Sequence, residues 1–97
     1  MIRTITNIER DNEAAWDTCD RTFAEFCSHV RSARYNTASA MIGELSMAFE
    51  HVGLDADTCE LLEIIAATMV HAASRLGGVG RIGPLVAAFE SVIENEM

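Results

Sequence analysis

The chain has 97 residues, of which 49% are hydrophobic and 23% are charged. These values exclude an intrinsically disordered protein and predict a single domain, residues 1–97, with a hydrophobic core. Fifteen acidic residues against seven basic ones give a net charge of −8. This balance argues against direct binding of nucleic acid, which requires a basic surface.

Cysteine usage and hydropathy indicate the compartment. The three cysteines are an odd number and include no Cys-x-x-Cys pair, so we expect reduced thiols. The first residues lack the apolar core of a signal peptide. The longest uncharged run, residues 64–74, is shorter than the roughly 20 residues that cross a bilayer. We therefore expect a cytoplasmic protein with no membrane contact.

The first predicted helix spans residues 7–33. Thr6 and Glu9 form a capping box before it. Its apolar residues recur at helical spacing: Ile8, Ala15, Trp16, Cys19, Phe23, Phe26, Cys27 and Val30. At about 1.5 Å per residue the helix would be roughly 40 Å long, against about 24 Å for the next one. It must either bend or extend past its neighbours.

The second and third predicted helices span residues 37–52 and 57–76. Asn36 is the expected N-cap of the second, and Gly53 follows its end. Asp57 is the expected N-cap of the third, and Gly77 follows that helix. The third helix is apolar around most of its circumference, which is typical of a central helix. Its predicted core stripe is Leu61, Ile65, Met69, Ala72 and Leu76.

The fourth predicted helix spans residues 84–95 and begins with Pro84, a residue favoured in a first turn. No stretch shows the alternation of a strand. The sequence therefore predicts an all-α, small four-helix bundle-like domain, with a long first helix and a central apolar third helix.

Motifs with possible chemistry are few. Gly78-x-Gly80-x-x-Gly83 has the spacing of a dinucleotide-binding loop, but a helix rather than a strand precedes it. We interpret it as a connector between helices, with an anion held near Arg81 as the lesser alternative. No His, Cys or acidic residues show the spacing of a closed zinc site. We expect no cofactor, no metal and no enzymatic activity.

Residues 71–76 carry one resemblance. An exposed His71 in a four-helix protein of this length resembles histidine-containing phosphotransfer domains, which carry a Lys three residues after the histidine and then a Gly. Ser74 and Arg75 stand at those two positions here. The resemblance would imply that His71 accepts a phosphoryl group from a response regulator, and the missing Lys and Gly predict that it does not.

Two surfaces are candidates for contact with a partner. The first is an apolar seam on the first or third helix, formed by Phe23, Phe26, Val30, Ile64 and Val70. Such a seam would also favour a homodimer, the commonest small assembly. The second is an acidic face on the first helix, formed by Glu9, Glu13, Asp17, Asp20 and Glu25.

These features predict a non-enzymatic regulatory or inhibitory protein that occupies a surface of a partner protein. One alternative is an acidic nucleic-acid mimic, such as a phage anti-defence protein, that inhibits a nucleic-acid-binding protein. Another is a degenerate histidine phosphotransfer-like domain. The sequence does not identify the partner.

Overall fold

The computed structural model describes the backbone of residues 7–75 and 82–96 and the side chains of residues 13–75 and 82–95. Within these ranges the chain forms four helices and no strand. They are α1 (Asn7–Arg31), α2 (Tyr35–His51), α3 (Ala56–Arg75) and α4 (Gly83–Glu96). The predicted small all-α helical bundle is therefore confirmed.

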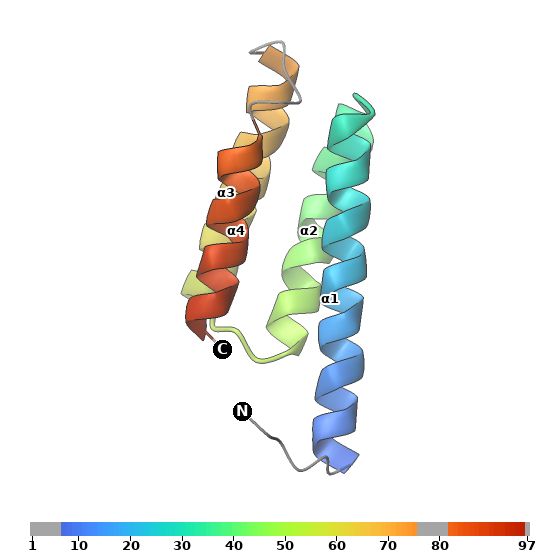
Figure 1. Cartoon of the computed structure of the whole chain (residues 1–97), viewed down its shortest axis with the longest axis vertical. Helices are drawn as coiled ribbons and strands as arrows, with labels where there is room; N and C mark the ends of the chain where they lie inside the picture. Colours follow the sequence, from blue (N-terminus) through green and yellow to red (C-terminus); the bar gives the residue numbers. More distant parts are fainter. Residues whose placement is uncertain (1–6, 76–81, 97) are drawn as a thin grey trace.

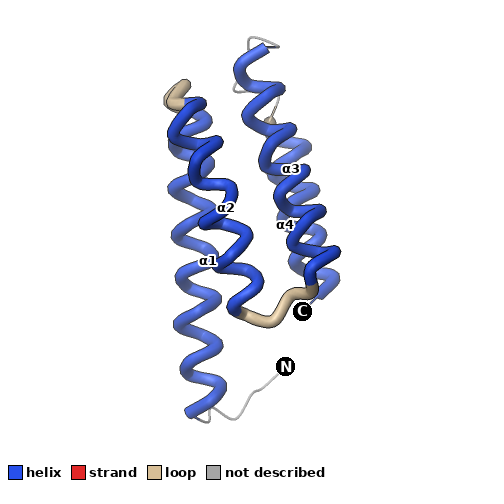
Figure 2. The backbone as a smooth tube through the Cα atoms, turned by 180° about the vertical axis from the view of Figure 1, so that it is seen from behind, coloured by secondary structure: helices blue, strands red, loops and turns tan. Residues whose placement is uncertain are grey.

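The helices alternate in direction along the chain (Figure 1). Helices α1 and α4 lie on the side that faces the viewer in Figure 1, and Figure 2 shows the same arrangement from behind. Short loops join α1 to α2 and α2 to α3, so these neighbours pack antiparallel. As one continuous helix of 25 residues, α1 extends past the level of the α2–α3 loop. The length mismatch in the sequence thus appears as an overhang.

Aromatic rings join three of the helices at the centre of the bundle. Phe49 of α2 makes edge-to-face contacts with Trp16 and with Phe89, at centroid distances of 6.1 and 5.6 Å. Phe89 of α4 also stacks on Phe23 of α1 at 4.2 Å. Such pairs stabilise beyond the area they bury. The largest fully buried side chains around them include Phe26, Leu45, Leu62 and Met69.

The buried face of α3 differs from the predicted stripe. Leu61 is 45% exposed, whereas its neighbour Leu62 is 1% exposed. The face that packs inward is centred on Leu62, Ala66, Met69 and Ala73. It is rotated by roughly 70° from the predicted stripe, with which it shares Met69. The prediction of Leu61 as a core residue is therefore wrong, although Met69 and Ala72 are buried as expected.

The ends of α1 and α2 follow one backbone motif. After α2, the N–H of Gly53 bonds to Glu50 O and that of Leu54 to Phe49 O, with Gly53 at φ 102°. This pattern is a Schellman motif, in which a left-handed residue ends the helix. The expected role of Gly53 is confirmed. The equivalent residue after α1 is Ala33, at φ 60°, and α1 therefore ends at Arg31, before the predicted residue 33.

Two predicted N-caps are wrong. Helix α2 begins at Tyr35, so Asn36 lies inside it, and Arg34 occupies the cap position without a side-chain cap bond. Tyr35 is held because its hydroxyl donates to Ala73 O of α3, at 3.3 Å. At α3 the cap is Asp55, because its Oδ1 accepts the N–H of Thr58 at 2.8 Å. Asp57 lies within the first turn of that helix.

Candidate protein-binding groove

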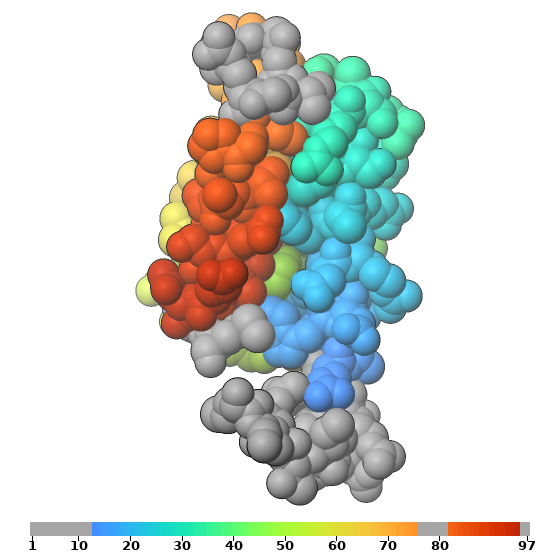
Figure 3. All heavy atoms as spheres, viewed as in Figure 1, coloured from blue at the N-terminus to red at the C-terminus, as the bar shows by residue number. Residues whose placement is uncertain are grey.

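A groove with a volume of about 400 Å³ runs between α1 and α4. Figure 3 shows these helices side by side on one face, with green atoms of α2 visible deep between them. The stacked rings of Phe23 and Phe89 lie between the two helices and hold their backbones apart. The surface of the bundle is thus hollowed between α1 and α4.

The floor and walls of the groove are largely apolar. Phe49 of α2 is buried at the floor. Phe23 from α1 and Val86 and Ile93 from α4 are half-buried and form the walls. Ala24 is an exposed small residue on the α1 side. The groove therefore offers apolar surface that no part of the described chain covers.

The charges on the groove are unevenly placed. Asp20 on α1 and Glu90 and Glu94 on α4 are exposed carboxylates, whereas Arg31 is the cation among the lining residues. Helices α1 and α4 run in opposite directions (Figure 1), so Asp20 lies towards the Glu94 end and Arg31 towards the Val86 end. The groove therefore has an acidic end and a basic end.

The three thiols are buried and free. Burial, together with the nearby charge of Asp20, raises the pKa of Cys19 from 9.0 to about 11. Burial also raises the pKa of Cys27 in the groove, where Arg31 lowers and Glu90 raises it. Burial likewise raises the pKa of Cys59. Thiols in this state are poor nucleophiles and poor metal ligands, because both roles require the thiolate.

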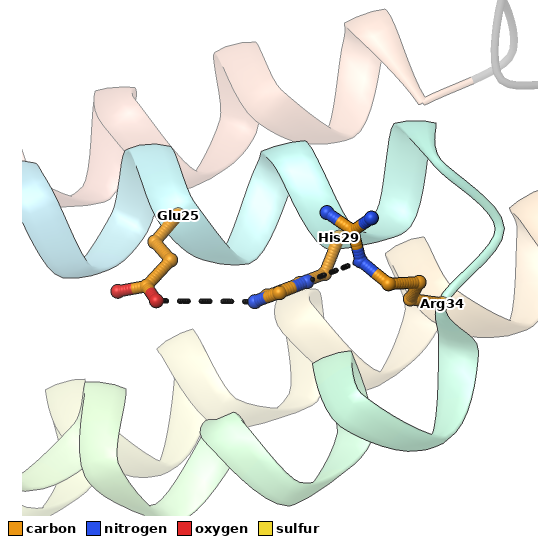
Figure 4. Close-up of polar contacts among 3 residues, drawn as sticks. All are labelled: Glu25, His29 and Arg34. Carbon is orange, nitrogen blue, oxygen red and sulfur yellow. Dashed lines mark hydrogen bonds and ion pairs between the residues drawn. The ribbon is translucent and has the colours of Figure 1, made fainter.

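A polar cluster lies at the end of α1 (Figure 4). The Nε–H of Arg34 donates to His29 Nδ1 at 2.8 Å, and His29 Nε2 lies 3.9 Å from Glu25 Oε1. His29 therefore lies between Arg34 on its Nδ1 side and Glu25 on its Nε2 side. The cluster joins α1 to the residue before α2, and we assign it a structural role.

The predicted apolar seam is not a continuous surface. Phe26 and Val30 are fully buried and Val70 is 8% exposed, so all three belong to the core of the chain's own bundle. Their prediction as interface residues is therefore corrected. The error arose because an apolar helix face has the same sequence pattern whether it packs on its own chain or on another chain. Phe23 lines the groove, and Ile64 is 56% exposed on α3.

The predicted acidic face is also divided. Asp17 and Asp20 are exposed on one side of α1, and Glu13 is half-buried on the same side. Glu25 lies about 140° around the helix from Asp20, at about 100° per residue, and faces His29. The side chain of Glu9 is outside the described residues.

The remaining sequence predictions concern His71, the glycine-rich segment, metal binding and membrane spans. His71 is exposed on α3, where the Ser74 hydroxyl donates to its carbonyl oxygen at 3.1 Å. Gly78, Gly80 and Arg81 lie outside the described residues, and α3 precedes them. Among the side chains described, no three His, Cys, Asp or Glu residues are grouped to hold a metal. Searched over the same part of the chain, no helix is long and apolar enough to cross a membrane.

Sequence reasoning missed the α4 side of the groove. Val86, Glu90 and Ile93 follow one another at intervals of four and three residues, which places them on one stripe of a helix. A stripe that mixes apolar and acidic residues signals a half-exposed face. Which helix lies opposite that stripe is a property of the tertiary structure.

Comparison of the chain with protein-family models, with curated proteins and with solved structures finds no match.

Proposed function

We propose that this chain is a non-enzymatic regulatory or inhibitory protein that acts by occupying a surface of a partner protein. The observation that supports this most directly is the α1–α4 groove, whose apolar walls are open to solvent. Exposed apolar surface rimmed by polar residues is typical of protein–protein contact sites, and apolar grooves are a common docking site for a partner's helix. The proposal places the protein in the cytoplasm, in keeping with its three free thiols.

Two matched substitutions on α1 test this proposal. Ala24 is exposed and lines the groove, so Ala24→Arg fills the groove without removing core contacts. Ala14 is equally an exposed alanine of α1, but it lies outside the groove, so Ala14→Arg introduces the same side chain elsewhere. Both variants should remain folded by circular dichroism.

The readout is affinity capture from the native host, with proteins identified by mass spectrometry. We expect a specific protein to be retained by the wild type and by Ala14→Arg and lost by Ala24→Arg. If every specifically captured protein is retained by Ala24→Arg, the groove is not the binding surface and the proposal fails.

Nucleic-acid mimicry is a second candidate, supported by the exposed carboxylates of Asp17 and Asp20 on one side of α1. A charge-driven contact weakens steeply with ionic strength, because the Debye length falls from about 10 Å at 0.1 M to about 3 Å at 1 M salt. Asp17→Asn lies outside the groove residues and reduces this charge. Mimicry predicts that this variant weakens the captured complex and that Ala24→Arg has little effect.

A further inference from the structure

The dimensions of the α1–α4 groove restrict its occupant. The lining residues of α1 run from Asp20 to Arg31, which at about 1.5 Å per residue corresponds to roughly 16 Å. That length equals about three helical turns. A helix that docks in such a groove presents apolar residues at positions i, i+3 or i+4, and i+7 along one face.

The charges restrict it further. Asp20 stands on one side of the groove and Glu90 and Glu94 on the other, and all three are exposed. Among the side chains at 13–75 and 82–95, no ion pair joins these carboxylates to a cation. A second copy of this chain, with its net charge of −8, and a nucleic acid would both meet repulsion here.

From these observations we infer that the groove binds an amphipathic helix of a partner protein whose apolar anchors are flanked by Lys or Arg. The inference rests on the proposed function and names the class of partner. The anchors contact the half-buried walls formed by Phe23, Val86 and Ile93, and the flanking cations lie beside the three carboxylates.

The same charges orient the bound helix. A helix carries partial positive charge at its N-terminus and partial negative charge at its C-terminus. Its N-terminus is therefore favoured at the end of the groove that holds Asp20 and Glu94, and its C-terminus near Arg31. The bound helix consequently runs parallel to α1 and antiparallel to α4.

Designed peptides test this assignment. One peptide of about four turns carries Leu at the anchor positions and Lys beside them, and a second replaces each Lys with Glu. Neither contains Trp, so the single Trp of the protein, Trp16, reports binding through its contact with Phe49 at 6.1 Å. Amide chemical-shift mapping locates the peptide. We expect saturable binding of the Lys peptide, with shifts in α1 and α4, and much weaker binding of the Glu peptide.

Charge reversal supplies the decisive variant. The groove triple Asp20→Lys, Glu90→Lys and Glu94→Lys changes exposed residues only. Its control changes the net charge equally, through three exposed residues of α2 and α3: Glu44→Lys, Glu50→Lys and Glu60→Lys. We expect the groove triple to weaken the Lys peptide by roughly tenfold, since three exposed ion pairs are lost, and the control by at most about twofold.

Several results would overturn the inference. They are equal weakening by both triple variants, equal affinity of the wild type for both peptides, and shifts in the groove that arise from self-association without peptide. Failure of the peptides while Ala24→Arg still abolishes capture of a cellular protein refutes the basic helix and leaves the proposed function standing. If Ala24→Arg retains both the captured protein and the peptide, the inference and the proposed function are both refuted.

Discussion

Replacing either of two adjacent leucines of α3 by alanine tests which face of that helix is buried. Leu62→Ala removes three carbon atoms from a side chain that is 1% exposed. At about 0.8 kcal/mol per buried carbon, the lost transfer free energy is roughly 2.4 kcal/mol. The cavity left behind adds to this, so we expect a total of about 3–5 kcal/mol. Since domains are stable by about 5–15 kcal/mol, this change consumes much of the total.

Leu61→Ala is the matched control, because it makes the same chemical change one residue earlier. Leu61 is 45% exposed, so its truncation removes about half the transfer term and leaves no closed cavity. We expect a cost of about 1 kcal/mol or less. This small cost distinguishes a surface leucine from a core one.

Urea denaturation followed by far-ultraviolet circular dichroism measures both free energies, and unchanged m-values would show that the unfolding transition is comparable. The reasoning is refuted if Leu61→Ala destabilises as much as Leu62→Ala. Equal costs would mean that α3 presents its Leu61 side to the interior or to another chain. A cost under about 1 kcal/mol for both would make α3 peripheral.

Four further predictions follow from local features. Because the pKa of Cys19 is raised from 9.0 to about 11, the unfolded chain binds fewer protons than the folded chain between these pH values, and the free energy of unfolding should fall as pH rises from 9 to 11. The fall should be smaller in Cys19→Ala. Thermal melts in which the wild type and Cys19→Ala decline in parallel would contradict this. Asp55→Ala should lower the melting temperature more than Asp57→Ala, and equal melting temperatures would contradict the cap. Because hydrogen bonds from Thr58 lower the pKa of Asp55, the contribution of Asp55 to stability should be lost as pH falls through this lowered pKa. Ala33→Gly should stabilise by roughly 0.5–1 kcal/mol in urea denaturation, since φ 60° strains an alanine, and destabilisation would argue against that backbone. Sedimentation equilibrium should show a dimer that Ile64→Glu, at a 56% exposed position, returns to monomer; a wild type of monomer mass at every concentration would exclude the dimer.

The sequence by itself determined the all-helical class and most of the helix ends. Apolar residues at intervals of three and four residues located all four helices to within about two residues at each described end. Gly53 and Pro84 act locally through backbone geometry, so their positions predicted the end of α2 and the first turn of α4. The length of the first helix predicted either a bend or an overhang, since helix length follows directly from residue number, and the structure has the overhang.

Tertiary structure alone decided which faces meet. Because α3 is apolar around most of its circumference, its periodicity did not distinguish Leu61 from Leu62, and the packing of α2 and α4 selects the buried side. Asp55 and Asp57 are equally suitable caps by residue type, and the path of the loop chooses Asp55. The groove joins Asp20 to Glu94 across most of the chain length, and its depth depends on the rings stacked between α1 and α4. Helical periodicity reports the face of one helix at a time, so a site formed between the first and last helices exists only once the bundle has assembled.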